Sequence, residues 1–292
     1  METVNWLQQK VNQLPQEYTE PQYWLAGIGA GLIAVNLTLT WRGDNVEVLG
    51  NNFMFLGAAG FLIWEKRDKL KLESSFLATI FGLAIVAIVL LKSSAISGYD
   101  VFLRLSPFIS GIGLALIASG WQVWKQYWQE LTLLIFPIIS PGLLLKFFDV
   151  SPITAKFATF ILWYLNFPVK NNGSYIILPT GVVDVYFGCS GYSSMTQLLG
   201  LSVLFLFMFP TTKKQKIYLP ILAVTVGFVV NAIRVALMAY LVAYSTDQAF
   251  QYWHKGDGSL IFSMIAVAIF GFFCWLLVLR EEDKPKQKQG EE

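Results

Sequence analysis

Apolar residues recur along this chain in long runs that contain few charges and are separated by short polar stretches. A helix needs roughly 20 mainly apolar residues to cross a hydrocarbon core about 30 Å thick. The pattern therefore predicts an all-α polytopic membrane protein with about eight transmembrane helices. The expected spans lie near residues 23–41, 48–64, 74–91, 105–124, 131–148, 190–209, 217–244 and 259–279.

The second span is the weakest of the set. It is short and opens with Asn51 and Asn52, so a re-entrant helix is an alternative at this place. The first 22 residues are polar and contain neither a basic n-region nor a small-residue cleavage site, which argues against a cleaved signal peptide. The first span is therefore expected to stay in the mature chain.

Composition agrees with this class of protein. Of 292 residues, 55% are hydrophobic and 15% are aromatic. Only 14% are charged, against about 25% in an ordinary soluble domain. An ordinary soluble fold is therefore excluded by composition as well as by pattern.

Lysine and arginine are concentrated in three short polar stretches, and such stretches lie mainly in the cytoplasm. Between the first two stretches the chain must then cross the membrane an even number of times, yet five apolar segments lie there. One of these segments is therefore expected not to cross. The basic residues are Lys66, Arg67, Lys69 and Lys71, then Lys213, Lys214 and Lys216, then Arg280, Lys284, Lys286 and Lys288.

The segment 151–167 is the best candidate for the one that does not cross. It contains Lys156 and ends in Trp163, Tyr164 and Asn166, and aromatic residues of this kind favour the membrane interface. We interpret it as a helix that lies on the outer surface of the membrane.

Eight crossings then leave both termini in the cytoplasm and residues 149–189 and 245–258 on the outer face. Within the first outer segment, residues 175–178 and 182–187 are rich in β-branched and aromatic side chains and flank the turn Pro179-Thr180-Gly181. This pattern predicts a short hairpin that leads directly to Cys189.

Cys189 is the first candidate for a reactive residue. Exposed N–H groups and the dipole at a helix start would favour its thiolate. The other cysteine, Cys274, lies in the middle of the last span and is read as an inert apolar residue. A disulfide between the two is improbable, because one is deep in the membrane and the other is at its outer edge.

Arg234 is the only charged residue between Ile217 and Tyr244. An arginine within a span costs about 2.5–3.5 kcal/mol on insertion scales, and such a cost usually indicates a function. The alternative is a purely structural role, in which Arg234 extends to the membrane interface or forms an internal salt bridge. Asn231 stands three residues earlier on the same helical face and would point its amide into the same site.

His254, the only histidine, lies in the polar loop before the last span. It shares the expected outer face with Cys189 and Arg234, so a nucleophile, a permanent cation and a proton carrier meet there. Asp257 would orient the imidazole or cap the following helix. One histidine with scattered carboxylates does not make a metal site, so we expect neither a metal nor a cofactor.

Three motifs in this order resemble the exosortase and archaeosortase family. They are Phe187-Gly-Cys-Ser-Gly-Tyr192 at the start of a span, Asn231-Ala-Ile-Arg234 within the next, and His254-Lys-Gly-Asp-Gly258 before the last. The resemblance covers about residues 75–280, and the spacing suggests the cyanobacterial branch. On this basis we interpret residues 1–72 as an N-terminal membrane segment with two spans, 73–280 as the catalytic membrane core and 281–292 as a disordered cytoplasmic tail.

The resemblance implies a transpeptidase of the bacterial inner membrane with its site on the outer face. Its protein partners would carry a C-terminal sorting signal, made of a short Pro-Glu-Pro motif, one transmembrane helix and a basic end. Cys189 would be the nucleophile and Arg234 and His254 its partners, with Asn231, Ser190 and Gly191 as candidates for substrate binding. The acyl acceptor, the scissile bond and the oligomeric state are not indicated by the sequence.

Two other functions fit parts of the same pattern. Gly188-Cys189-Ser190-Gly191 also resembles the G-x-S-G of rhomboid-like intramembrane proteases, which would make Ser190 the nucleophile. A transporter could use Arg234 to bind an anion between helices. The first alternative places its histidine within a span rather than in a loop, and the second gives Cys189 and His254 no role.

Overall fold

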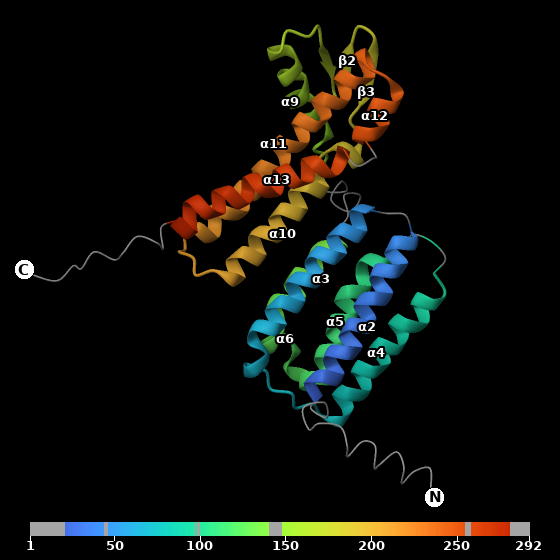
Figure 1. Cartoon of the computed structure of the whole chain (residues 1–292), viewed down its shortest axis with the longest axis vertical. Coiled ribbons are helices and arrows are strands. Elements are labelled where there is room, and N and C mark those ends of the chain that lie inside the picture. The colour runs from blue at the N-terminus through green and yellow to red at the C-terminus, as the bar shows by residue number, and fades with distance from the viewer. Residues whose placement is uncertain are drawn as a thin grey trace, which may run out of the picture. The chain divides into compact units, whose positions relative to one another are not determined.

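The computed structural model describes residues 21–43, 46–96, 98, 100–139, 148–254 and 258–280, and it is mostly helical (Figure 1). The chain divides into two compact units, Met1–Ile138 and Ile139–Glu292. The predicted disordered tail, 281–292, and Asp257 lie outside the described residues. The sequence analysis places a boundary at residue 72, between an N-terminal membrane segment and the catalytic core, on the basis of family resemblance. That boundary stays a prediction.

The first unit is a bundle of helices, joined by short 3-10 turns. Its α-helices are α2 (Pro21–Arg42), α3 (Val46–Lys66), α4 (Phe76–Ser94), α5 (Phe102–Ser119), α6 (Val123–Gln126) and α7 (Trp128–Ile135). Its 3-10 turns are η2 (Arg67–Lys69), η3 (Gly120–Gln122) and η4 (Phe136–Ile138). Helices α4 and α5 approach closely at Gly82, which has no side chain. A Cβ at this position would lie only 2.6 Å from the carbonyl oxygen of Gly113.

A buried polar cluster joins α2, α3 and α5. Pro107 has no N–H, so the carbonyl of Leu103 lacks its usual partner in the helix. Asn36 donates to this carbonyl at 2.9 Å and Asn52 at 3.3 Å, and Asn52 also donates to Asn36 at 2.9 Å. Asn52, which makes the second span look weak in the sequence, therefore satisfies a broken helical bond, and α3 is continuous over 21 residues.

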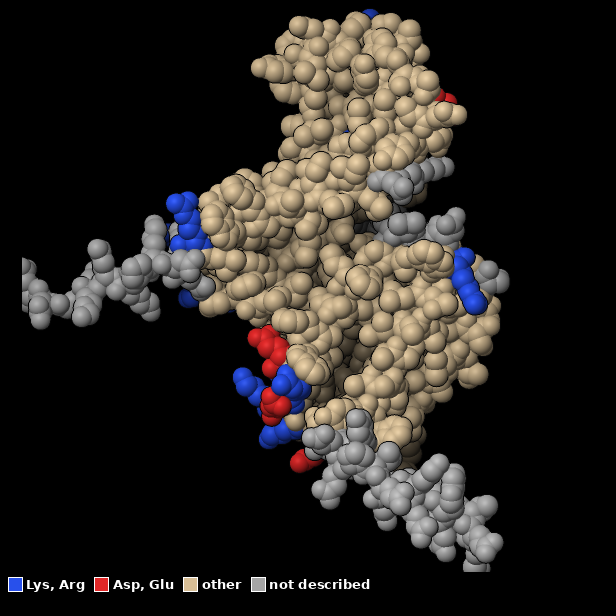
Figure 2. Space-filling model, in the orientation of Figure 1, with Lys and Arg blue, Asp and Glu red and all other residues tan. Residues whose placement is uncertain are grey.

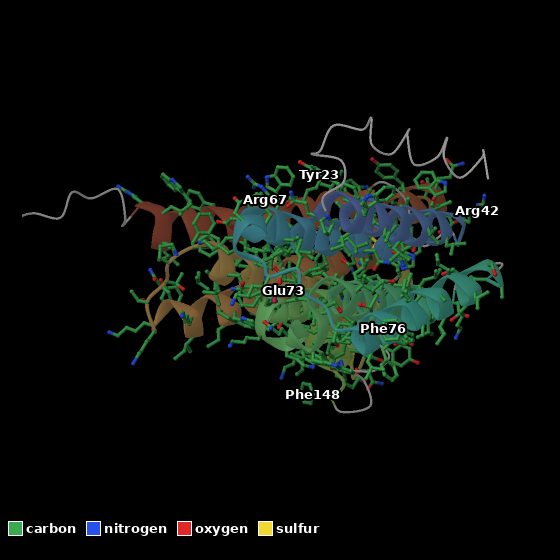
Figure 3. The ribbon with its side chains drawn as sticks, turned by 90° about the horizontal axis from the view of Figure 1, so that it is seen from below. Tyr23, Arg42, Arg67, Glu73, Phe76 and Phe148 are labelled. Carbon is green, nitrogen blue, oxygen red and sulfur yellow. The ribbon has the colours of Figure 1, made fainter. Side chains whose placement is uncertain are left out.

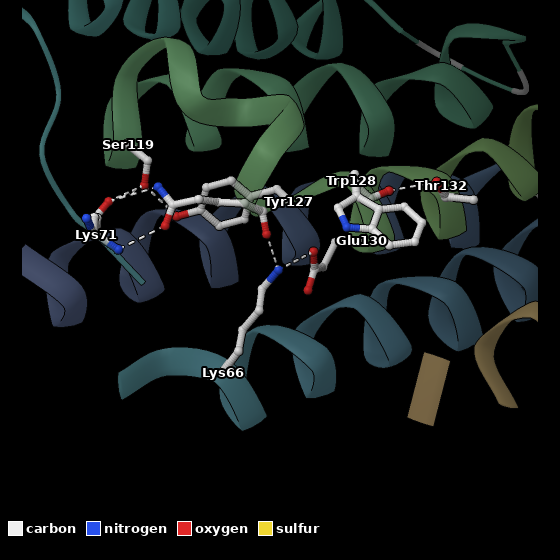
Figure 4. A network of polar contacts seen from close by, with 8 residues as sticks. Lys66, Lys71, Ser119, Tyr127, Trp128, Glu130 and Thr132 are labelled. Atoms are coloured by element: carbon white, nitrogen blue, oxygen red, sulfur yellow. Dashed lines mark hydrogen bonds and ion pairs between the residues drawn. The ribbon is translucent and has the colours of Figure 1, made fainter. Parts of the chain in front are cut away.

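A second polar cluster connects the end of α3 and the segment after it to α5, α6 and α7 (Figure 4). Lys66 Nζ lies 2.7 Å from Glu130 Oε2 and also donates to the carbonyl of Gln126. Ser119 contacts the hydroxyl of Tyr127 at 2.9 Å and donates to the carbonyl of Lys71 at 2.7 Å. Glu130 is 3% exposed, so its charge depends on Lys66 for compensation.

The helices of the first unit expose apolar surface, as expected for contact with lipid. Tyr23 and Phe76 project outward from the bundle in Figure 3, and Phe76 is 79% exposed. On the face drawn in Figure 2 the charged side chains gather at the ends of the helices rather than along their middles. This distribution is that of a membrane protein, in which charge avoids the hydrocarbon core.

Five helices in the described part of the chain are long and apolar enough to cross a membrane: Pro21–Arg42, Phe76–Ser94, Phe102–Gln126, Gln215–Tyr244 and Gly258–Leu279. Helix α3 is long enough but is not among them, and α10 is apolar but shorter. The predicted span 131–148 lies partly outside the described residues. The protein is therefore multi-pass, and the count of eight spans stays a prediction.

The second unit combines helices with a small sheet. It contains α9 (Ser151–Tyr164), β1 (Lys170–Asn172), β2 (Tyr175–Leu178), β3 (Gly181–Asp184), the 3-10 turn η5 (Phe187–Cys189), α10 (Tyr192–Met208), α11 (Gln215–Tyr244), α12 (Asp247–His254), α13 (Gly258–Cys274) and a π-helical turn, Trp275–Leu279. Helix α9 has 14 residues, about 21 Å, which is too short to cross the hydrocarbon core.

The sheet is antiparallel in the order β1-β2-β3. Strands β2 and β3 form the hairpin expected from the sequence, with Tyr175 opposite Asp184 and Leu178 opposite Gly181. Strand β1 adds an edge that the sequence does not predict, because Lys170-Asn171-Asn172 has no strand-forming side chains. The fold is thus mostly helical, as predicted, and the predicted hairpin is part of a small three-stranded sheet.

Helix α11 organises the second unit. It has 30 residues, about 45 Å, and contributes to two separate cores. One half packs with α10 and α13 through residues such as Leu219, and the other half packs with α9 and the sheet through residues such as Ala239. A Cβ on Gly227 would lie 3.0 Å from Met195, so this glycine permits close packing of α10 and α11. Arg234 lies between the two cores.

Candidate active site

Cys189 closes the turn that connects the hairpin to α10. It is the last residue of η5, and α10 begins at Tyr192 after an N-cap at Gly191. Gly191 has φ of 98°, and a Cβ there would lie 2.9 Å from the side-chain nitrogen of Asn231. Both the backbone angle and the space require glycine. The N-cap residue of α10 is Gly191, so the hydroxyl of the neighbouring Ser190 does not cap this helix.

The backbone of this turn is held from two neighbouring helices. Asn231 Nδ2 on α11 donates to the carbonyl of Cys189 at 2.9 Å, and Thr154 Oγ1 on α9 donates to the carbonyl of Ser190 at 2.8 Å. The Ser190 hydroxyl donates to the carbonyl of Phe187 at 2.6 Å and is fully buried. Three hydrogen bonds therefore fix the backbone of the turn, while the Cys189 side chain remains partly exposed.

His254 is the last residue of the short amphipathic helix α12, not a loop residue as the sequence suggests. Phe250, one turn earlier, stacks on its imidazole with ring centroids 4.9 Å apart and an interplanar angle of 17°. The imidazole Nε2 lies 3.6 Å from Cys189 Sγ, within hydrogen-bonding range for sulfur. Helix α12 thus brings the only histidine to the cysteine across 65 residues of sequence.

Arg234 approaches the same group from α11. Its Nη2 donates to the carbonyl of His254 at 2.9 Å, so the guanidinium holds the end of α12 in place. Its Nε is buried and has no hydrogen-bond partner among the described residues. A buried donor of this kind is costly unless a ligand satisfies it.

Burial and charge act on the cysteine in opposite directions. Burial raises the pKa of the Cys189 thiol above its ordinary value, while the Arg234 cation and a hydrogen bond from the Tyr186 hydroxyl lower it. The sequence predicts a thiol ionised by a helix start, but desolvation is the largest effect here. The side chain lines a mainly apolar pocket, and burial there favours the neutral thiol over the thiolate.

The pocket beside Cys189 has a volume of about 210 Å³ and is mainly apolar. It is formed by the hairpin, α11 and α12. Its polar and ionisable members are Asp184, Tyr186, Cys189, Arg234 and His254, and its apolar members are Val182, Val183, Val185, Val235, Met238, Val242 and Phe250. Among the described residues, His, Cys, Asp and Glu side chains form no group of three or more that could hold a metal ion.

The structure brings the three predicted catalytic residues together. The three candidates for substrate binding, Asn231, Ser190 and Gly191, are buried at the turn and do not line the pocket, and their role in binding stays a prediction. Cys274 is a buried free cysteine packed in the core of α10, α11 and α13. Thr154 and Tyr186 are contacts of the turn that sequence reasoning missed, because no pattern of spacing distinguishes them from other polar residues.

Comparison with known families decides the class of protein. The sequence model of the family described as "Transmembrane exosortase (Exosortase_EpsH)" matches residues 9–271. The chain belongs to the transmembrane exosortase family. No curated protein and no solved structure matches the chain. Exosortases are membrane proteins of a protease and transpeptidase family that act on exported proteins bearing C-terminal sorting signals. The predicted cyanobacterial branch is not tested.

The family gives this exosortase its membrane location and the general nature of its reaction. The contact between Cys189 and His254, together with Arg234 on the same histidine, is the one arrangement in the described pocket that suits cleavage of a peptide bond.

Proposed function

We propose that this exosortase cleaves the C-terminal sorting signals of exported proteins through a thioester on Cys189 and transfers the released protein to an acceptor nucleophile. The observation that carries the proposal is the 3.6 Å contact between Cys189 Sγ and His254 Nε2. A nucleophile within reach of a base, with the base held by a third group, is the arrangement of nucleophilic peptidases. Arg234 is that third group, through its bond to the His254 carbonyl.

In the first half of the reaction, Nε2 takes the proton of the thiol, and the resulting thiolate attacks the scissile carbonyl. The carbon–sulfur bond forms, the carbon–nitrogen bond breaks, and the departing amine takes the proton from Nε2. In the second half, Nε2 takes a proton from the acceptor, which attacks the thioester and releases Cys189, which regains that proton. His254 serves as base and acid in turn, and no other proton carrier is needed.

Arg234 contributes charge and a donor, not proton transfer, since a guanidinium stays protonated at any accessible pH. One of its nitrogens holds His254, and its buried Nε is left for a substrate. The carbonyl oxygen becomes negative during attack, and a fixed donor at that position stabilises the transition state. We assign this oxyanion role to Arg234.

The substrate geometry follows from the predicted topology. Residues 149–189 and 245–258 would lie on the outer face of the inner membrane, with both termini in the cytoplasm. A substrate with one transmembrane helix and a basic cytoplasmic end would then present the residues before its helix to the pocket. Holding that helix beside the spans removes much of the entropic cost of the encounter. Residues 73–280 would supply this catalytic core.

The contacts of Ser190 do not favour it as the nucleophile of a rhomboid-like protease. Its hydroxyl is fully buried and already donates to the carbonyl of Phe187, and the histidine contacts the cysteine beside it. Deprotonating Ser190 would require the turn to open. The proposal therefore keeps Cys189 as the nucleophile.

Cleavage of a sorting-signal substrate by Cys189→Ala, Ser190→Ala and Cys274→Ala tests this assignment. We expect no cleavage with Cys189→Ala, because no thioester can form, and substantial cleavage with Ser190→Ala. Cys274→Ala is the matched control, since it removes the other buried thiol at a distance from the pocket. Normal cleavage by Cys189→Ala would refute the proposal.

A further inference from the structure

Tyr186 lies beside the nucleophile and has no part in the mechanism described so far. It lines the same pocket as Cys189, Arg234 and His254, and its backbone carbonyl accepts the N–H of Cys189 at 2.9 Å. The side chain is 47% exposed, although the pocket is mainly apolar. The position of its ring is set by the turn itself.

Gly188 is the residue that makes this position possible. A Cβ at Gly188 would lie 2.6 Å from the Tyr186 ring and 3.2 Å from its hydroxyl, distances that no side chain would tolerate unmoved. Gly188 is not among the described glycines with positive φ, so its backbone conformation is open to other residues. The absence of a Cβ at Gly188 therefore leaves the space in which the Tyr186 ring lies, one residue before the nucleophile.

We infer that Tyr186 is a further catalytic residue of this exosortase, whose hydroxyl donates a hydrogen bond to the sulfur of Cys189 and stabilises the thiolate formed when His254 takes the thiol proton. This inference rests on the proposed role of Cys189. Gly188 is a positioning residue, which acts by leaving space for the Tyr186 ring over the turn.

The electrostatics of the site support a donor rather than a base. Burial, followed by the charge of Cys189 and the hydrogen bond to it, raises the pKa of the Tyr186 hydroxyl above its ordinary value, so the hydroxyl keeps its proton. The charged and titratable groups that face Cys189 in the pocket are Tyr186 and Asp184 from the hairpin side, Arg234 from α11 and His254 from α12. Tyr186 is the one of these that donates an uncharged O–H.

The rate at which iodoacetamide alkylates Cys189 measures the thiolate without any substrate. We would follow the Cys189 peptide by mass spectrometry in purified, detergent-solubilised full-length protein from pH 6 to pH 11.5, because the pKa of this thiol is raised and the range must extend above it. Tyr186→Phe should react about three- to tenfold more slowly than wild type near pH 7, the effect of one hydrogen bond, and at the same rate once the thiol is fully ionised. Tyr175→Phe is the matched control, because Tyr175 is 46% exposed and does not line the pocket.

Gly188→Ala provides a second, independent variant. Its new Cβ should displace the Tyr186 ring and slow alkylation to a similar extent near pH 7. The double variant should be no slower than either single one, because both remove the same hydrogen bond. Multiplied effects would mean that Gly188 does not act through Tyr186.

Two results would overturn the inference: an unchanged profile for Tyr186→Phe, or a reduction by the same factor at every pH, which would indicate altered access. Its failure is separable from that of the proposed function. If Cys189→Ala abolishes cleavage while Tyr186→Phe alkylates as wild type, the nucleophile stands and the role of Tyr186 does not. If Cys189→Ala cleaves normally, the proposed function fails whatever the alkylation rates.

Discussion

At the scale of single residues, the proposed chemistry depends on three side chains that meet in one pocket, Cys189, Arg234 and His254. The sequence points to them because the chain has two cysteines, one histidine and a single charged residue between Ile217 and Tyr244. Tyr186 and Thr154 are ordinary residue types in ordinary positions, and their roles depend on contacts across the fold. The ionisation of Cys189 was predicted in the wrong direction because burial in the pocket cannot be read from a local motif.

Arg234→Lys tests the geometry of the cation. The variant keeps the charge but loses the planar fork that lets Arg234 hold His254 and offer a second donor. Loss of one oxyanion donor typically reduces the rate by about 10²–10³. We expect a reduction of that order in substrate cleavage, with alkylation of Cys189 near wild type. Cleavage at the normal rate by Arg234→Lys would show that only the charge matters.

Arg234→Met tests the charge. The cation lowers the pKa of the Cys189 thiol against the larger effect of burial, so its removal should raise that pKa further. The thiolate fraction rises with pH, and the alkylation rate of the variant should therefore fall near neutral pH and recover at high pH. Arg67→Met, which removes an exposed cation of the first unit, should leave the profile unchanged. A profile of Arg234→Met equal to wild type would contradict this electrostatic role.

At the scale of elements, apolar periodicity predicts the long helices well and the short polar ones poorly. Helices α2, α4, α11 and α13 lie close to their expected spans. Asp247–His254 has no apolar run, so the sequence predicts a loop there, yet the segment is helix α12 and carries the histidine proposed as the general base. Strand β1 cannot be predicted from the sequence for a similar reason. Its own side chains do not favour a strand, and it forms by pairing with β2.

The cluster around Lys66 and Glu130 gives a prediction about the first unit. Lys66→Met should leave a buried, uncompensated carboxylate and destabilise the protein by roughly 3 kcal/mol, because Glu130 is almost fully buried. The midpoint of thermal unfolding in detergent measures this. Arg67→Met is the matched control, since its ion pair with Asp68 is exposed and contributes at most about 1 kcal/mol.

Restoring neutrality completes that test. Lys66→Met combined with Glu130→Gln should recover most of the lost stability, because no charge then remains buried. If the double variant is as unstable as Lys66→Met alone, the loss comes from packing of the lysine stem and not from the ion pair.

At the scale of the whole molecule, the predicted topology assigns the candidate site to the outer face of the membrane. The positions of the basic clusters and the number of spans together determine on which side of the membrane each loop lies. One error in the number of spans would therefore move every later loop to the other side. With Cys189→Ala and Cys274→Ala as background, which removes both native thiols, Tyr175→Cys should react with a membrane-impermeant thiol reagent on intact cells, and Lys214→Cys should not. Both positions are exposed, so accessibility differs only through the membrane face. Labelling at position 214 without labelling at position 175 would show that the predicted orientation in the membrane is the reverse of the true one.

The most direct measurement is the mass of the enzyme during turnover. Full-length protein incubated with a sorting-signal substrate and quenched in acid should carry the acyl fragment on the peptide that contains Cys189, in a linkage that hydroxylamine cleaves. The adduct should persist in Ser190→Ala and be absent from Cys189→Ala. An acyl group on Ser190, or continued cleavage by Cys189→Ala, would contradict the thioester mechanism.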